Sequence, residues 1–281
     1  MSYRTLISTD ALSAHLSDPA FVIVDCRFEL ADANAGERAY EAGHIPGAGY
    51  AHLDRDLSGT KTGLNGRHPL PDAVALSRAL GRLGVANESQ VVAYDQDNGM
   101  FASRLWWLLR WLGHEDVAVL DGGFAKWIAE RRATATGRER RQERRFIGQP
   151  RSDMTVQASD VAQILRNPDW RLLDARAPER FRGDVEPIDR VPGHIPGATN
   201  HFFKSNVADD GTFKSTQDLR SAFNASGGGV PTDHLVCYCG SGVTACQNLL
   251  ALEHAGLHGA KLYAGSWSEW SSDPARPTER G

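Results

Sequence analysis

The sequence predicts an α/β fold built from two similar domains in tandem, each a parallel sheet flanked by helices. The hexapeptide GHIPGA occurs at residues 43–48 and again at 193–198. Three further segments match in the same order: VIVDCR (22–27) with LLDAR (172–176), VVAYD (91–95) with LVCYC (235–239), and GGFAKW (122–127) with GSWSEW (265–270). Within each half, short apolar runs alternate with amphipathic stretches, which is typical of parallel α/β sheets.

The individual elements follow from this alternation. Buried strands are expected at 21–24, 91–94 and 117–120 in the first half, and at 171–173, 235–238 and 260–263 in the second. Helices are expected at 72–83, 103–112, 158–166, 216–223 and 244–255. In parallel sheets ligands bind at the carboxyl ends of strands, where the loop after residue 238 falls.

The predicted division is an N-terminal domain at 1–135, a linker at 136–154 and a C-terminal domain at 155–281. Residues 131–151 contain eight Arg against two Glu. A nucleic-acid-binding arm is one interpretation of this segment; a solvated linker laid over both domains is the favoured one. The polar tail at 271–281 is expected to be a loose end.

Composition narrows the function classes. The net charge of −4 gives no general attraction to nucleic acid or anionic membrane. The N-terminus lacks the pattern of a secretory signal, and the apolar run 105–113 is interrupted by Arg110, so it is expected to be a buried helix. Four cysteines fit neither a disulfide scaffold nor a zinc site, which favours reduced thiols in the cytoplasm. No metal, nucleotide or flavin motif is present, so no cofactor is expected.

The stretch 234–250, HLVCYCGSGVTACQNLL, predicts a strand, a small-residue loop and a helix opening near Thr244. Cys239 is the first residue after the strand. The side chains of Gly240, Ser241 and Gly242 are too small to shield the backbone amides of the loop. Inward-pointing amides and the positive end of the helix favour a thiolate, so Cys239 is expected to be a nucleophile. The competing interpretation is a joint that needs glycine for its geometry, with Cys239 an incidental buried thiol.

Taken together, the doubled domain, the two GHIPGA motifs, CGSGVT and GSWSEW resemble the tandem-domain rhodanese-type sulfurtransferases over essentially the whole chain. The resemblance implies two rhodanese-like domains, only the second catalytic, with the active site facing the domain interface. The first copy has Asp95 where the second has Cys239, and a carboxylate cannot carry a sulfane sulfur. The first copy is therefore expected to be chemically silent.

The resemblance also implies the reaction. Cys239 would accept sulfur from a donor as a persulfide, which the amides of residues 240–244 would stabilise, with Gly240, Gly242, Val243 and Thr244 forming the cradle and Thr244 bonding the loop or capping the helix. Family members that prefer 3-mercaptopyruvate carry CGSGVT, whereas those that prefer thiosulfate carry CRKGVT. 3-Mercaptopyruvate is therefore the expected donor, and thiosulfate is the alternative.

The same resemblance supplies further site residues. Arg180 falls at the family's carboxylate-binding arginine. A second arginine is expected shortly after an EP dipeptide, but here the sequence departs from the pattern, and Arg190 is the candidate. A Ser–His–Asp relay is expected from Ser241, His68 and Asp54. Without the resemblance, His68 would be interpreted as a surface turn residue.

Other polar residues are given structural roles because they repeat in both copies: His44 with His194 as turn residues, and Asp25 with Asp174 as partners of loop amides or of a cation. Trp106, Trp107 and Trp111 are expected to pack in the core or at a domain interface, and Cys237 and Cys246 to be buried and inert.

Two other function classes were weighed. A Cdc25-like phosphatase needs a C-x5-R loop, but Ala245 stands at the arginine position. A rhodanese module that only binds partners would normally lack the cysteine. The expected partners are a small sulfur donor and an acceptor, which could be cyanide, a small thiol or a thioredoxin-like protein; neither nucleic acid nor membrane is expected.

Overall fold

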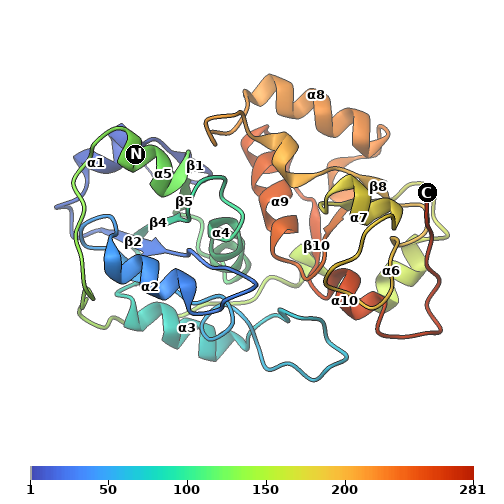
Figure 1. The fold of residues 1–281 in the computed structure, drawn as a ribbon, viewed down its shortest axis with the longest axis horizontal. Helices are drawn as coiled ribbons and strands as arrows, with labels where there is room; N and C mark the ends of the chain where they lie inside the picture. The colour runs from blue at the N-terminus through green and yellow to red at the C-terminus, as the bar shows by residue number, and fades with distance from the viewer. Residues whose placement is uncertain (1) are drawn as a thin grey trace. The chain divides into compact units, whose positions relative to one another are not determined.

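The computed structural model describes residues 2–281, which form two compact units (Figure 1). The first unit contains the chain up to Gly59, Pro71–Arg151 and Val207–Phe213. The second contains Thr60–Leu70, Ser152–Asn206 and Lys214–Gly281. Each unit thus includes a short segment that a linear division of the sequence places in the other half. The linker ends at 136 and 154 stay a prediction.

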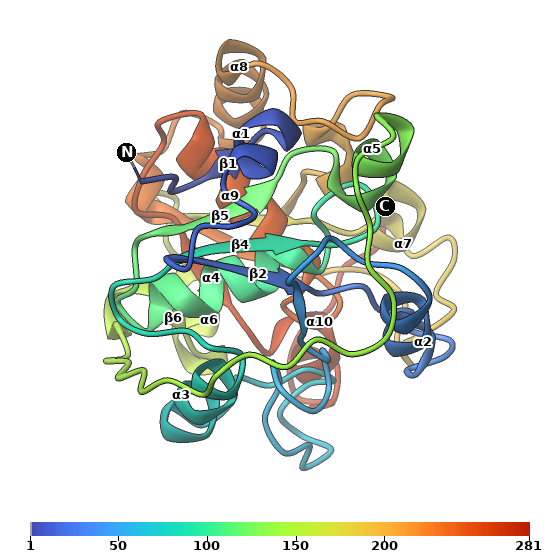
Figure 2. The same cartoon turned by 90° about the vertical axis from the view of Figure 1, so that its left-hand side faces the viewer.

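Unit 1 is a five-stranded parallel sheet in the order β1-β5-β4-β2-β3. Figure 2 shows β5, β4 and β2 side by side. Its strands are β1 (Leu6–Ile7), β2 (Phe21–Asp25), β3 (Gly49–Tyr50), β4 (Gln90–Tyr94) and β5 (Val117–Leu120). Its helices are α1 (Thr9–Ala14), α2 (Ala35–Ala42), α3 (Ala73–Arg82), α4 (Ala102–Trp111) and α5 (Gly123–Ala129).

Unit 2 repeats this plan with the strand order β6-β10-β9-β7-β8, again parallel throughout. Its strands are β6 (Thr155–Val156), β7 (Arg171–Asp174), β8 (Thr199–Asn200), β9 (Leu235–Tyr238) and β10 (Lys261–Tyr263). Its helices are α6 (Ala158–Ile164), α7 (Pro178–Arg182), α8 (Thr216–Gly227), α9 (Thr244–His254) and α10 (Ser266–Trp270), with short 3₁₀ turns at Ser152–Met154, Phe203–Asn206 and Thr232–His234. The predicted fold class, two α/β domains that each contain a parallel sheet flanked by helices, is confirmed.

The central strands are buried along their whole length because helices cover both faces of a parallel sheet. All of β4 and all of β9 are buried. Trp106 and Trp107 of α4 are each 1% exposed, so they are buried, as expected for side chains that pack in a core or at an interface. The predicted helices are confirmed to within a few residues of their ends. The short helices α1, α2, α5, α7 and α10 and the two-residue strands were not predicted.

The repeated motifs perform the same structural task in each unit. The Nδ1 atom of His44 lies 2.8 Å from the carbonyl oxygen of Tyr40, and that of His194 lies 2.7 Å from the carbonyl oxygen of Phe181. Each imidazole also stacks on the ring of that same residue. The predicted structural role of the two histidines is confirmed.

The repeated aspartates also pair alike. Asp25 accepts hydrogen bonds from the guanidinium of Arg27, and Asp174 from that of Arg176; each also accepts the backbone N–H of that arginine. The prediction that these aspartates pair with loop amides or a cation is confirmed, and both partners are present.

Candidate active site

Cys239 lies immediately after β9, at the carboxyl edge of the second sheet. It is 2% exposed, and its Sγ accepts a hydrogen bond from the N–H of Gly242 at 3.1 Å. Gly242 has a φ of +76°, and a Cβ on it would lie 2.4 Å from the carbonyl oxygen of Ala264. Only glycine fits this position, so the loop folds back to place an amide on the sulfur. This arrangement stabilises negative charge on Sγ.

The first residues of α10 form hydrogen bonds with the backbone of the loop that follows β9. The N–H of Cys239 donates to Ser266 Oγ at 3.1 Å. The N–H groups of Trp267 and Ser268 donate to the carbonyl oxygens of Cys239 and Gly240. The GSWSEW repeat pointed to this segment as a shared motif, but its hydrogen bonds to the nucleophile's backbone were not foreseen.

Of the two roles predicted for Thr244, capping the helix is wrong, and bonding the loop stays a prediction. Thr244 is the first residue of α9, the N-cap is Val243, and no side chain caps the helix. A threonine inside the first turn directs its side chain away from the orphan N–H groups that a capping residue satisfies.

His68 and Ser241 are brought together. The Nδ1 atom of His68 lies 2.7 Å from Ser241 Oγ, and the two residues are 3% and 7% exposed. The interpretation of His68 as a surface turn residue is therefore wrong: the segment Thr60–Leu70 packs with unit 2 and buries the imidazole. Asp54 belongs to unit 1, in the turn where its N–H donates to His52 Nδ1, and its part in the relay stays a prediction.

Two guanidinium groups lie over the backbone of Gly240. A Cβ on this glycine would be 2.7 Å from an Nη of Arg67 and 3.7 Å from an Nη of Arg180. Arg180 was predicted from the family pattern. Arg67 was not predicted, although it directly precedes His68 in the sequence. Its contact with Gly240 joins two segments far apart along the chain, and no local sequence pattern indicates such a contact. The two place positive charge beside the nucleophile's loop.

Acidic residues hold both arginines. Arg180 donates to Glu186 Oε1 at 2.7 Å and to Asp189 Oδ2 at 3.2 Å, and Arg67 also pairs with Asp189. Arg190 is exposed and lines a cavity of about 640 Å³ together with Arg67, Asp189 and Ser268. The residue after the EP dipeptide that meets Arg180 is thus Asp189, and a contact between Arg190 and substrate stays a prediction.

The remaining thiols are buried. None of the four cysteines, all within residues 2–281, forms a disulfide. Burial raises the pKa of Cys237 far above its ordinary value, and the Cys246 thiol donates to the carbonyl oxygen of Gly242 at 3.2 Å. Cys237 and Cys246 are confirmed as buried, whereas the sulfur of Cys239 accepts the N–H of Gly242.

Comparison with known proteins identifies the family. The rhodanese-like domain family matches residues 8–130 and 157–273. The chain belongs to the tandem rhodanese-domain sulfurtransferases. It is 49% identical over 283 residues to a probable 3-mercaptopyruvate sulfurtransferase of Pseudomonas aeruginosa, with all of both chains covered. It is also 41% identical to a putative thiosulfate sulfurtransferase of Mycobacterium tuberculosis, over 92% of this chain and 90% of that one.

Among solved structures, the chain is similar to the crystal structure of SseA from Escherichia coli, which is described as a 3-mercaptopyruvate sulfotransferase. The TM-score is 0.83 at 32% identity, covering 94% of this chain and 99% of that one.

The corresponding loop of the sulfurtransferase's unit 1 holds a carboxylate. Asp95, 2% exposed, accepts the N–H groups of Gly99, Phe101 and Ala102 at 3.0, 2.7 and 3.0 Å. Burial raises the pKa of Asp95, and these three hydrogen bonds oppose that rise. The carboxylate oxygens of Asp95 thus accept loop N–H groups where unit 2 has the Cys239 sulfur.

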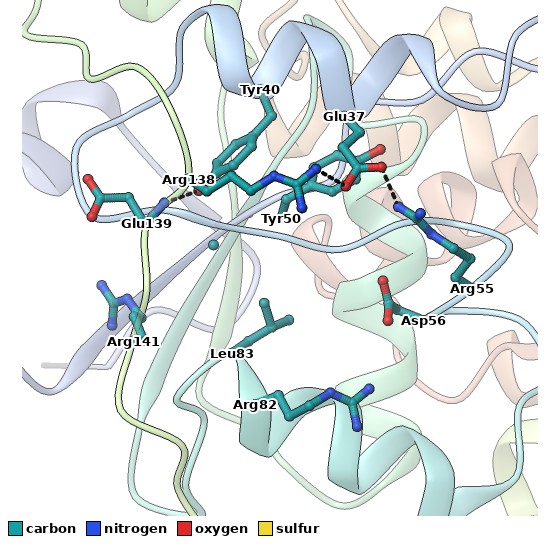
Figure 3. A pocket seen from close by; sticks show the side chains of 11 residues that line it. Glu37, Tyr40, Tyr50, Arg55, Asp56, Arg82, Leu83, Arg138, Glu139 and Arg141 are labelled. Carbon is teal, nitrogen blue, oxygen red and sulfur yellow. Dashed lines mark hydrogen bonds and ion pairs between the residues drawn. The ribbon is translucent and has the colours of Figure 1, made fainter.

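The arginine-rich segment of the sulfurtransferase packs against unit 1. Arg138 pairs with Glu37, which also pairs with Arg55 at 2.6 Å, as Figure 3 shows around a cavity of about 350 Å³. Arg141 donates to the carbonyl oxygens of Gly47 and Phe21. These arginines are held by unit 1, which favours a linker over a nucleic-acid-binding arm. Within residues 2–281, no helix is both long and apolar enough to cross a bilayer.

Proposed function

We propose that this sulfurtransferase takes sulfur from 3-mercaptopyruvate as a Cys239 persulfide and passes it to a thiol or to cyanide. The observation that carries the proposal is the pair of guanidinium groups, Arg67 and Arg180, beside Gly240 in a loop whose own side chains carry no cation. A planar carboxylate is the natural partner for such a pair. The loop holds the sulfur end of the donor, and the arginines hold the carboxylate end.

The chemistry balances in two steps. The Cys239 thiolate attacks the donor sulfur, the carbon–sulfur bond breaks, and its electron pair leaves on carbon as the enolate of pyruvate. The proton of the donor thiol passes to that carbon, and the Cys239 persulfide remains as an anion beside the Gly242 N–H. The acceptor then attacks the outer sulfur and releases the Cys239 thiolate.

Ser241 and His68 are the groups proposed to move that proton. The Nδ1 of His68 and Oγ of Ser241 are within hydrogen-bonding distance, and Ser241 lies two residues after the nucleophile. The His68 ring is buried, so Ser241 Oγ is a partner that the fold holds within its reach. Asp54 as the third member is supported by the family resemblance alone.

Thiosulfate is the second candidate donor. The positive charge of Arg67 and Arg180 would serve it, and one relative has that name, whereas the relative at 49% identity is named for 3-mercaptopyruvate. Thiosulfate is a compact dianion, and both arginines already face acidic partners. The geometry therefore favours the monocarboxylate.

A small thiol, cyanide or a reduced thioredoxin-like protein would each suit the second step. The four cysteines form no disulfide in residues 2–281, which is typical of a reducing compartment, and a cytoplasmic location is proposed on that ground.

The test is a comparison of kcat/KM for 3-mercaptopyruvate and for thiosulfate, with cyanide as acceptor. The wild type is expected to prefer 3-mercaptopyruvate, and Cys239→Ala is expected to lose activity with both donors. Cys26→Ala, which removes a buried thiol of unit 1, is the matched control and keeps the activity. Preference for thiosulfate would contradict the donor, and activity in Cys239→Ala would contradict the persulfide mechanism.

A further inference from the structure

Asp189 occupies an unusual position between the two arginines that lie over Gly240. Its side chain is 8% exposed, with one carboxylate oxygen against Arg67 and the other 3.2 Å from Arg180. The carboxylate of Asp189 thus already takes up hydrogen bonds that the proposed function assigns to the carboxylate of the donor.

The charges of this cluster cancel. It contains three arginines and three acids joined by ion pairs: Arg67, Arg176, Arg180, Asp174, Glu186 and Asp189. An incoming anion therefore meets no net positive charge unless one acid moves aside or takes a proton. Lys61 and Arg190 are exposed residues of the adjoining cavity, where solvent screens their charge.

Of the three acids, Asp189 is the one held least firmly. Asp174 is fully buried and bound by Arg176 through both oxygens. Glu186 accepts the N–H groups of Ile188 and Asp189 at 3.0 Å besides its arginines, and these bonds contribute to lowering its pKa. Burial instead raises the pKa of Asp189. Asp189 is therefore distinguished from the other two acids by its place: each of its carboxylate oxygens faces one of the two arginines that lie over Gly240.

We propose that Asp189 determines donor specificity: its carboxylate occupies the anion position between Arg67 and Arg180, so the site admits a monoanion and disfavours a dianion. Coulomb energy is proportional to the product of the charges. The negative charge of Asp189 thus weakens the binding of a dianion twice as strongly, in free energy, as that of a monoanion. This inference rests on the proposed function, since it takes Arg67 and Arg180 to be the donor's anchors.

The test is Asp189→Asn in the full chain, which keeps the shape of the side chain and removes its charge. KM for 3-mercaptopyruvate is expected to fall about threefold and KM for thiosulfate about tenfold, the square of the first factor, because charge enters twice. The matched control is Asp184→Asn, which removes one charge from an exposed residue paired with Arg182, and it should leave both values unchanged.

Binding separates this inference from the proposed function. Dissociation constants of pyruvate, a monoanion, and sulfate, a dianion, are measured by calorimetry, which needs no turnover. Both dissociation constants are expected to fall in Asp189→Asn, about tenfold for sulfate and about threefold for pyruvate. If the wild type fails to use 3-mercaptopyruvate but these ratios hold, the donor assignment fails and the role of Asp189 stands.

The opposite results overturn the inference. If Asp189 only positions the arginines, Asp189→Asn will weaken both anions and raise both KM values. Equal factors for the monoanion and the dianion would also contradict it. Asp189→Glu, which keeps the charge, covers the case in which Asp189→Asn does not fold: it should keep the wild-type ratio of the two donors, and a shift toward thiosulfate would refute the charge argument.

Discussion

The loop after β4 and the loop after β9 place different atoms in the same kind of cradle. In each unit the tyrosine that ends the strand accepts a backbone N–H from the HIPGA motif: Tyr94 from Ile45 at 3.3 Å, and Tyr238 from Ile195 at 3.2 Å. The next residue then receives loop amides. Asp95 receives three, and Cys239 receives that of Gly242.

The surroundings of the two cradles also differ. Phe181 and Tyr40 are equivalent, because each stacks on the histidine of its HIPGA motif and accepts from it through its carbonyl. Arg180 therefore corresponds to Ala39, which lines a cavity of about 260 Å³ beside Asp95 together with Arg27. Both joints thus direct loop amides onto the residue after the strand, but they differ in that residue and in the arginine that unit 2 places over its loop.

The largest expected effect comes from exchanging the two central residues. Cys239→Asp should lower kcat by at least about a thousandfold, because a carboxylate cannot hold the transferred sulfur. Adding Asp95→Cys to that variant should not restore activity, since Ala39 stands where unit 2 has Arg180, and the guanidinium of Arg27 is held by Asp25. Mass spectrometry after exposure to the donor checks this. A gain of one sulfur atom at residue 95 would show that the cradle alone is sufficient for the chemistry.

The next effect is on stability. Asp95→Ala should destabilise unit 1 by about 3 kcal/mol, because it leaves three buried N–H groups without an acceptor. Urea unfolding measures the change, with Asp97→Ala, an exposed residue of the same loop, as the control. A loss below about 0.5 kcal/mol, the usual range of surface substitutions, would mean that the carboxylate contributes little to holding the silent loop.

A smaller effect is expected at the histidine that unit 2 adds to its loop. His68→Asn should lower kcat with 3-mercaptopyruvate about a hundredfold, because the departing enolate needs a proton. Activity with thiosulfate should be nearly unchanged, since its leaving group, sulfite, needs none. Steady-state kinetics with both donors test this on one preparation, and equal losses with the two would count against the relay.

The smallest effect is expected at Gly240. In Gly240→Ala the new methyl meets the ends of the flexible Arg67 and Arg180 side chains, so KM for 3-mercaptopyruvate should rise about threefold with little loss of stability. Gly242→Ala is the contrast, because its methyl meets backbone and its φ is positive; the loss of stability should be about 1–3 kcal/mol. Thermal unfolding and kinetics of the pair check this, and equal damage from both would contradict the assigned geometry.

The sequence by itself determined the plan of the chain. Its repeats predicted two parallel α/β domains, and its apolar runs located the central strands, because buried strands and longer helices leave a periodic pattern. The position of Cys239 before a run of small residues also predicted the loop at the carboxyl end of its strand, and the match of Asp95 to it located the equivalent loop of unit 1. Edge strands such as Leu6–Ile7 escaped prediction because two residues are too few to show a period.

Only the tertiary structure decided which distant side chains meet. His68 reaches Ser241 across 173 residues, and Arg67 reaches Asp189 across 122. Both contacts exist because the segment Thr60–Leu70 packs with the second unit, and a local pattern reports only on neighbours along the chain. The same packing places the carboxylate of Asp189 between Arg67 and Arg180. In the sequence, Asp189 had been noted only as a departure from the family motif.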